Sequence, residues 1–384
     1  MKPKTKKLLR LSGCAMALGL VLAAAAYFGG AKISGVTFGP DGAHVADGTL
    51  QTLTKEFPER FQSIDLDIES GDVEFVFSDH FGAEIESCYG ERFSCSVTDG
   101  TLQITDTSAS NGTVWMNFNF DFSTWKQNTV KILLPENVSL KTVKMRIGDG
   151  NADLSGFSSE STDIQDRYGN LRISDASCGA ASFKLNSGSG TFQKVQANTL
   201  TYQNDYGKSV FENISVSDPQ KAVISAGSGG ISVKGFTASS LNLTDSYGEI
   251  DLNGLTLSNL TCSAGDGGTK ITDSSVGSSN LESAYGNIDV SGLDSEGLTV
   301  NGKDGNITLA GALKGKTDVH SDYGSIGIKT TLKQEQYTFG LSTEYGSVTV
   351  DGKKLNGALT QTGTAKNELN VFGKDGNVSV EFGK

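Results

Sequence analysis

Proline, histidine, cysteine and tryptophan are scarce in this 384-residue sequence, and their scarcity narrows the classes of protein it can encode. The chain has 5 Pro, 3 His, 5 Cys and 2 Trp. Low proline without a three-residue glycine period excludes collagen and proline-rich linkers. Five scattered cysteines form neither a dense disulfide framework nor a recognisable metal cluster. Cys88 and Cys95 flank a short YGERFS segment, where they either close a hairpin loop as a disulfide or remain free thiols.

Basic residues are fewer than acidic ones, with 32 Lys and Arg against 44 Asp and Glu, which gives a formal net charge of −12. An acidic surface repels polyanions, so we expect no nucleic-acid partner. Glycine, in contrast, is abundant, with 48 residues of 384. Together with short alternating runs such as NIDV and SVTV, this indicates many tight turns between short β-strands.

One long hydrophobic run lies near the N-terminus. Residues 1–10 carry five basic side chains and no acidic one, and residues 11–30 carry no charge. Twenty residues at about 1.5 Å each can just span a hydrocarbon core of about 30 Å. Because basic residues stay cytoplasmic, we predict a single-pass transmembrane signal-anchor at 11–30 and an extracytoplasmic C-terminal domain in the cell membrane. A cleaved signal peptide is the alternative, and lipidation of Cys14 is disfavoured because the apolar run follows that residue.

Short phrases built on glycine recur through the rest of the chain, for example SAYGNIDV at 283–290 and KDGNITL at 303–309. If one glycine of each phrase is taken as a marker, neighbouring markers lie 17 to 22 residues apart, most often 19. This regular period is typical of a repeat architecture. The markers are Gly150, Gly169, Gly190, Gly207, Gly229, Gly248, Gly267, Gly286, Gly305 and Gly324, continued by Gly346 and Gly376, with Gly71 as an outlying member.

Apolar residues keep a fixed phase to these markers, as Ile250 and Leu252 do after Gly248. Stacked units would place equivalent residues about 4.8 Å apart in continuous ladders. We therefore predict an all-β, single-stranded parallel β-solenoid with about 19 residues per coil, in which Cys262 is a buried core residue. The residues five before each marker are Met145, Ile164, Leu185, Tyr202, Ile224, Leu243, Cys262, Leu281, Val300, Val319, Leu341 and Val371.

These patterns divide the chain into five predicted segments. They are a cytoplasmic basic tail at 1–10, the transmembrane signal-anchor at 11–30, a stalk at 31–60, an N-terminal β region with an aromatic cap at 61–147, and the β-solenoid repeats at 148–384. Hairpin-built blades or a sandwich are less consistent with apolar columns that all run in the same sense.

The residue before each marker alternates between tyrosine and a small polar side chain. Since stacked corners touch, each ring can cover the small corner beside it, and corner packing is the simpler explanation. The alternative is a ligand surface of tyrosines about 9.6 Å apart that stack on sugar rings. The residues in order are Asp149, Tyr168, Ser189, Tyr206, Ser228, Tyr247, Asp266, Tyr285, Asp304 and Tyr323, continued by Tyr345 and Asp375.

Both tryptophans, Trp115 and Trp125, flank the aromatic segment WMNFNFDFSTW in the N-terminal β region. An open solenoid end invites edge-to-edge aggregation, so a cap over that end is the simpler interpretation. The alternative is that Trp115 and Trp125 belong to a contact patch for a partner or glycan.

No catalytic or metal-binding motif stands out. His44, His80 and His320 lie in unrelated phases of the repeat, and GSGG at 227–230 lacks the helix and lysine of a phosphate-binding loop. The aspartates at the markers could face Ca²⁺, but the nine-residue repeat of calcium-binding β-rolls is absent. We therefore expect no enzyme, no cofactor and no metal site, with a carbohydrate-active β-helix enzyme as the alternative.

The segment FQSIDLDIESGDVEFVFSDHFGAEIES, followed by DGTLQIT and serial YGNIDV and DGNITL units, resembles a bacterial adhesin family, the β-strand-repeat domain of unknown function 4097. The resemblance covers most of residues 61–384 and implies an envelope location, with no catalytic residues to carry over. We expect a membrane-anchored adhesin that meets a surface glycan or an envelope protein. A ligand-sensing or scaffold partner of a membrane signalling complex is the alternative.

Overall fold

The computed structural model describes residues 19, 21, 28, 35–39, 42–46, 50–57, 60–87, 93–106, 116–119, 127–217, 222–355 and 357–384. Cys14, Cys88, Trp115 and Trp125 lie outside these residues. So does the predicted membrane segment 11–30, apart from three positions that are helical. Within the described part of the chain, no helix has the length and apolar character needed to cross a membrane.

Strands make up almost all of the described chain and form a sheet of 27 strands and a separate sheet of three. The small sheet comprises β1 (Gly35–Gly39), β2 (Gly42–Ala46) and β9 (Met116–Asn119). The N-terminal strands of the large sheet are β3 (Gln51–Phe57), β4 (Ser63–Ser70), β5 (Asp72–Phe77), β6 (Phe81–Ser87), β7 (Phe93–Thr98), β8 (Thr101–Asp106) and β10 (Thr129–Leu134).

The central strands are β11 (Ser139–Asp149), β12 (Ala152–Ser155), β13 (Ser158–Tyr168), β14 (Leu171–Ser187), β15 (Gly190–Tyr206), β16 (Ser209–Val216), β17 (Ala222–Ser228), β18 (Ile231–Asp245), β19 (Ile250–Ala264), β20 (Thr269–Thr272), β21 (Ser275–Ser283), β22 (Ile288–Asp304), β23 (Ile307–Tyr323) and β24 (Ile326–Lys333). After a 3₁₀ turn at Gln334–Gln336 come β25 (Tyr337–Tyr345), β26 (Val348–Val350), β27 (Lys353–Leu355), β28 (Leu359–Gln361), β29 (Asn367–Asp375) and β30 (Val378–Gly383).

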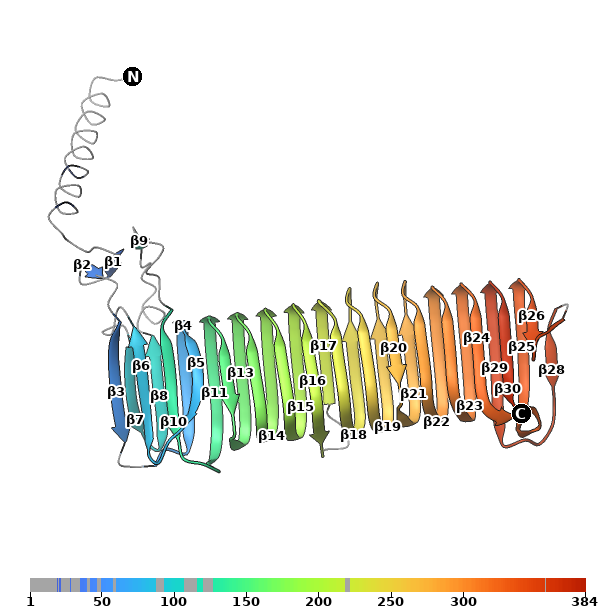
Figure 1. The fold of residues 1–384 in the computed structure, drawn as a ribbon, viewed down its shortest axis with the longest axis horizontal. Coiled ribbons are helices and arrows are strands. Elements are labelled where there is room, and N and C mark those ends of the chain that lie inside the picture. Colours follow the sequence, from blue (N-terminus) through green and yellow to red (C-terminus); the bar gives the residue numbers. More distant parts are fainter. Residues whose placement is uncertain are drawn as a thin grey trace, which may run out of the picture.

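The central strands stack in parallel as a β-solenoid, which confirms the predicted fold (Figure 1). Ile250 pairs with Thr269, Thr269 with Ile288, and the ladder continues through Ile307 to Ile326, each step 19 residues along the chain. All of these pairings are parallel. Equivalent residues of successive coils therefore become vertical neighbours, as the period of the sequence requires.

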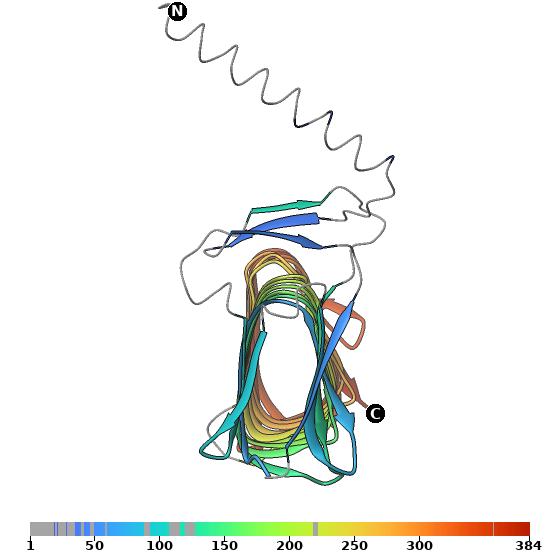
Figure 2. The same cartoon turned by 90° about the vertical axis from the view of Figure 1, so that its left-hand side faces the viewer.

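Each coil is a flattened loop with two walls, seen end-on in Figure 2. In β14, residues 171–174 pair with β12 in one wall, while residues 177–187 pair with β13 in the other. The chain turns between the walls at Asp175, which has a left-handed φ of 50°. Asp and Asn tolerate this region better than most non-glycine residues, and Gly235, Gly254 and Gly292 occupy it at the equivalent corner of later coils.

Side chains from both walls fill the space between them with continuous apolar columns. One column runs the length of the solenoid, and each of its members is at most 3% exposed. Cys262 belongs to it, and burial raises the pKa of its thiol to about 12. The column is Leu66, Met145, Ile164, Phe183, Tyr202, Ile224, Leu243, Cys262, Leu281, Val300, Val319, Val371 and Leu341.

Three sequence assignments were wrong in the coil of β14. The corner glycine is Gly188, not Gly190, and the column residue is Phe183, not Leu185. Gly190 is instead the first residue of β15 and pairs with Leu171. A Cβ there would sit 2.4 Å from the Tyr202 hydroxyl oxygen, so the glycine leaves room for that buried ring. The residue before the corner is accordingly Ser187, not Ser189.

The N-terminal end departs from the regular coil. β4 and β5 already form a coil beneath β11 and β12, with Gly71 at its corner. On the other side of this coil, β8 and β10 pair in parallel with β4 and β5, and the antiparallel pairs β3–β6, β6–β10 and β7–β8 are added there. The range 31–60, assigned to a stalk from its composition, contains β1, β2 and β3.

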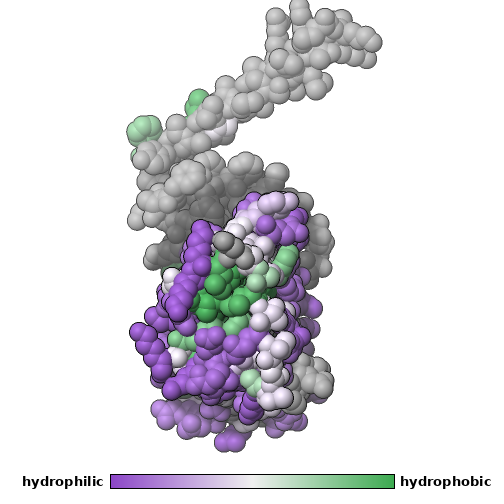
Figure 3. Space-filling model, turned by 90° about the vertical axis from the view of Figure 1, so that its right-hand side faces the viewer, coloured by the Kyte–Doolittle hydropathy of each residue, from purple (hydrophilic) through white to green (hydrophobic). Residues whose placement is uncertain are grey.

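At the C-terminal end the coils stack in an order different from the sequence. β29 and β30, the last strands of the chain, pair with β23 and β24 on one side and with β25 and β26 on the other. The final coil therefore lies inside the stack, and the preceding coil closes it. The short antiparallel strands β27 and β28 cover the terminal edges. Figure 3 shows apolar side chains gathered at this end within a polar rim.

Candidate functional site: a tyrosine edge

One edge of the solenoid is formed by the corner glycines. At this corner the backbones of successive coils approach so closely that a Cβ on Gly169 would lie 1.7 Å from the carbonyl oxygen of Gly150. A Cβ on Gly188 would lie 1.7 Å from the carbonyl oxygen of Gly169. Only glycine fits, and this explains the marker period. It is the edge at which β14, β15, β22 and β23 end, the upper edge in Figure 1.

The side chain before each corner glycine stands on this edge, which we call the tyrosine edge. Its tyrosines are largely solvent-exposed, with exposed fractions from 54% for Tyr323 to 72% for Tyr345. Packing over the neighbouring corner therefore leaves more than half of each side chain free. The six tyrosines are Tyr168, Tyr206, Tyr247, Tyr285, Tyr323 and Tyr345.

The alternation along the edge is complete only in the spatial order of the coils. In the sequence Tyr345 follows Tyr323 directly, which would place two rings on adjacent coils. The inserted final coil puts Asp375 between them, paired with both. From the coil of β11 onward the order is Asp149, Tyr168, Ser187, Tyr206, Ser228, Tyr247, Asp266, Tyr285, Asp304, Tyr323, Asp375 and Tyr345.

A second alternation, not found from the sequence, places a polar side chain inside each tyrosine corner and holds several of these corners by hydrogen bonds. The Asp245 Oδ1 accepts hydrogen bonds from the backbone N–H groups of Tyr247, at 3.2 Å, and Gly248, at 2.8 Å. The Ser283 hydroxyl accepts one from the N–H of Gly286 at 3.1 Å. The signal in the sequence is an Asp, Asn, Ser or Thr two residues before each Tyr-Gly pair, as in DRYG, NDYG and SAYG.

The same position is apolar or small in the coils without tyrosine, where it is Leu185, Ala226, Ala264 or Gly302. The polar group is therefore placed where it fixes the turn beneath a ring. Asn204 does this with Nδ2, which donates to the carbonyl oxygens of Gly188 at 3.0 Å and Gly207 at 3.1 Å. These bonds hold the backbone beside Tyr206, Tyr247 and Tyr285 in place before any ligand arrives.

Two of the inner groups are acids whose surroundings alter their titration. Asp166 is 2% exposed, and burial raises its pKa to about 7. The nearby Asp149 carboxylate adds to the rise, while the backbone N–H of Tyr168 opposes it. Burial likewise raises the pKa of Asp245 above its ordinary value, against the two backbone hydrogen bonds that it accepts. These carboxyl groups are structural parts of the corners.

An asparagine ladder runs beside the corner glycines. Asn170 Oδ1 accepts a hydrogen bond from the N–H of Ser189 at 2.9 Å, and Asn287 Oδ1 accepts one from the N–H of Asn306 at 2.8 Å. Asn306 in turn accepts from the N–H of Ser325 at 2.9 Å. Each amide joins one coil to the next, so the edge is stiffened along the solenoid axis.

The remaining predicted or candidate residues lie elsewhere. Trp115 and Trp125 fall outside the described residues, and between them β9 pairs with β1 in the small sheet. Cys95 is a buried free thiol. Within the described ranges, no group of three His, Cys, Asp or Glu side chains gathers as a metal site requires.

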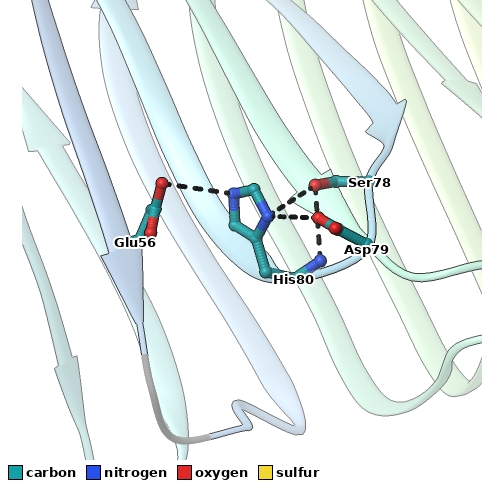
Figure 4. Close-up of polar contacts among 4 residues, drawn as sticks. All are labelled: Glu56, Ser78, Asp79 and His80. Carbon is teal, nitrogen blue, oxygen red and sulfur yellow. Dashed lines mark hydrogen bonds and ion pairs between the residues drawn. The ribbon is translucent and has the colours of Figure 1, made fainter.

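Ser78, Asp79 and His80 meet in the turn between β5 and β6 (Figure 4), but they do not form a catalytic relay. The Ser78 hydroxyl, at 3.1 Å, and the Asp79 carboxylate, at 2.6 Å, both face His80 Nδ1. A relay needs the nucleophile and the acid on opposite ring nitrogens. The hydrogen bond to Asp79 raises the pKa of His80 and lowers that of Asp79.

The repeated strands are also the part of the chain that is similar to known proteins. The model of the family described as Toastrack DUF4097 matches residues 61–220 and again residues 219–381. The chain belongs to the Toastrack DUF4097 family. Its two matched stretches run through the described solenoid from β4 into β30. Among functionally curated proteins none matches.

Several solved structures are similar to this Toastrack chain at low identity. A "putative adhesin" from Parabacteroides merdae ATCC 43184 is 18% identical, with 74% of this chain and 97% of that chain covered and a TM-score of 0.32. A "putative adhesin" from Bacteroides fragilis NCTC 9343 is 16% identical, with 68% and 97% covered and a TM-score of 0.30. A "putative cell adhesion protein" from Clostridium sporogenes ATCC 15579 is 11% identical, with 87% and 100% covered and a TM-score of 0.19. Likeness this weak carries no argument about function.

Proposed function

We propose that this Toastrack protein is a non-enzymatic adhesin of a bacterial cell envelope, and that its tyrosine edge binds a surface glycan. The observation that carries the proposal is the set of six tyrosines on alternate coils of one edge, each more than half exposed. A repeated row of exposed aromatic side chains is unusual on a protein surface that has no partner. An exposed ring face on a fixed backbone is suited to stacking on a sugar ring.

The geometry favours an extended polymer over a compact ligand. Successive tyrosines lie two coils apart, about 9.6 Å at the usual strand spacing. An extended glycan advances by about one coil per sugar ring, so every second sugar could meet a tyrosine. Each contact is weak, but several contacts on one rigid edge combine through effective concentration.

The proposed location rests on the N-terminal sequence. Residues 11–30 would hold the chain in the membrane as a single-pass anchor, and the solenoid would stand outside the cell membrane. The small sheet of β1, β2 and β9 lies beside the N-terminal end of the same edge (Figures 1 and 2), so both are presented on one side of the protein.

A glycan array tests the proposal with the full chain. A variant with Tyr206, Tyr247, Tyr285 and Tyr323 changed to Ala should lose binding and keep the circular dichroism of the native fold. Phe77→Ala, which removes a 54% exposed aromatic ring from outside the tyrosine edge, is the control and should bind normally. Neither protein should release reducing ends from the glycan. Unchanged binding by the tyrosine variant, or release of reducing ends, would contradict the proposal.

A further inference from the structure

The tyrosine edge has two halves of different chemistry. Between the tyrosines of the N-terminal half stand Ser187 and Ser228, whereas aspartates stand between those of the C-terminal half. Each aspartate with its two neighbouring tyrosines forms what we call a Tyr–Asp–Tyr notch. The third notch exists only because the final coil is inserted out of order. The notches are Tyr247–Asp266–Tyr285, Tyr285–Asp304–Tyr323 and Tyr323–Asp375–Tyr345.

The three carboxylates are open to a ligand. Asp266, Asp304 and Asp375 are all exposed, and none makes a side-chain hydrogen bond or ion pair with another described residue. Asp266 is flanked by glycines, with Gly265 before it and Gly267 and Gly268 after it. In contrast, Asp65, Asp175 and Asp294, which lie on the walls or the opposite corner, each have a basic partner within 4 Å.

The spacing of a notch suits a cation. A positive group held over the aspartate of one coil is about 4.8 Å from the corner of each neighbouring coil, where the tyrosines stand. Cation–π attraction acts within about 6 Å of a ring centroid. An ammonium group over the aspartate therefore lies between two tyrosine-bearing corners, at a spacing comparable with the range of cation–π attraction. The formal net charge of −12 also attracts a polycation over longer distances.

From these observations we infer that the C-terminal half of the tyrosine edge binds a polymer of amino sugars whose amines are free and protonated. The inference rests on the proposed function, because it takes the tyrosine edge as the glycan-binding face. Sugar rings stack on Tyr247, Tyr285, Tyr323 and Tyr345, and the ammonium groups occupy the notches between them. The serine-lined stretch from Tyr168 to Tyr247 has no aspartate between its tyrosines and suits the neutral sugars of the same or another glycan.

The test compares two probes that differ only at the amine. Binding of the full chain to a glucosamine hexamer and to its fully N-acetylated counterpart is measured by calorimetry at mildly acidic pH, where the free amines are charged. The test variant carries Asp266→Asn, Asp304→Asn and Asp375→Asn. The control variant removes three exposed charges away from the edge through Asp153→Asn, Asp251→Asn and Asp289→Asn.

The wild type should bind the free-amine hexamer more tightly than the acetylated one. Each notch is expected to contribute about two- to fivefold in affinity, so the test variant should bind the free-amine hexamer about 8- to 125-fold more weakly. The control variant should bind like the wild type. Equal loss in both variants would show general charge attraction and overturn the inference.

The result also separates this inference from the proposed function. If the acetylated hexamer binds as tightly as the free-amine hexamer, and Tyr247→Ala with Tyr285→Ala weakens both, the amine preference is wrong while the glycan-binding edge stands. If neither hexamer binds, the amino-sugar inference is wrong, and the glycan array alone decides whether the edge binds another glycan.

Discussion

The geometry of the tyrosine edge depends on the individual corner glycines. Their backbone conformations differ, since Gly207 has a positive φ of 124° whereas the φ of Gly169 lies outside the positive range that favours glycine. What they share is the close approach of the carbonyl oxygen one coil below, 2.1 Å from a Cβ at Gly207 and 1.7 Å at Gly169. The requirement for glycine is therefore mainly steric, and it comes from the stacked neighbour more than from the turn itself.

Gly169→Ala should therefore be costly, and Gly327→Ala should not. Gly327 lies in β24, and a Cβ added to it would have no neighbouring atom within 4 Å, so a methyl group meets open space there. We expect Gly169→Ala to lower the free energy of unfolding by about 2 to 4 kcal/mol and Gly327→Ala to change it by less than about 1 kcal/mol. Urea denaturation of the two variants checks this. Equal stability would mean that the coils can separate without cost.

Asp166 should make the stability of the fold depend on pH, and the burial of its carboxyl group sets the direction of that dependence. The carboxyl ionises near 3.8 when unfolded and near 7 in the fold, so the folded state keeps a proton that the unfolded state has lost. Stability should therefore fall as pH rises from about 4 to about 7, by about 1.4 kcal/mol per unit of pKa difference.

Asp166→Asn removes the titrating group and should flatten this dependence. Above neutral pH the variant should be more stable than the wild type, by about 2 to 4 kcal/mol, while in mild acid the two should be similar. Urea midpoints measured on both sides of neutrality decide the matter. A difference between the proteins that stays constant with pH would show that Asp166 does not carry the burial penalty.

At the scale of the element, the period of the sequence was enough to predict the parallel stack but not every register. Two glycines in the segment GSG at 188–190 both fit a period near 19, and the choice of Gly190 was wrong. The Tyr202 ring decides the register, because it fills the space above Gly190 and bonds to the Ser209 hydroxyl at 2.9 Å. Such packing across coils is not visible in spacing alone.

The order of the terminal coils could not be read from the chain either. Linear spacing places Tyr345 after Tyr323 and leaves the last strands outermost, whereas the structure inserts them. The broken alternation of Tyr and Asp was the one available sign. The sequence predicted the positions of the tyrosines on one edge. It did not predict how exposed their rings are, because that depends on the size of the neighbouring corners in the folded backbone.

Removing the last strands should therefore disturb an interior coil. If the chain ends at Lys366, β25 and β26 lose β29 and β30, their only parallel partners among the described strands. We expect amide hydrogens of 337–350 to lose protection against exchange, while those of 288–304 keep it, because stability in a solenoid is carried mainly by neighbouring coils. Protected amides at 337–350 in the shortened chain would contradict the inserted order.

For the whole molecule, the consequence of the fold is a straight edge that repeats one side chain at every second coil. Both ends of the stack protect their edges. At the N-terminal end the Lys55 side chain reaches from β3 to β7, and its Nζ donates to the carbonyl oxygen of Cys95 at 2.5 Å. Inward-pointing charges of this kind protect an edge strand from pairing with a strand of another chain. The long sides of the solenoid therefore remain the surfaces available for ligand binding.

The most direct test of the tyrosine edge is the dependence of affinity on ligand length. Affinity of the full chain is measured for glucosamine oligomers of increasing length and for their N-acetylated counterparts. If the edge is the binding face, affinity should rise each time the oligomer reaches another tyrosine, about 9.6 Å further along, and the four-tyrosine variant should show no such rise. An affinity that stays the same at every length for both series, or that rises equally in the variant, would contradict the account.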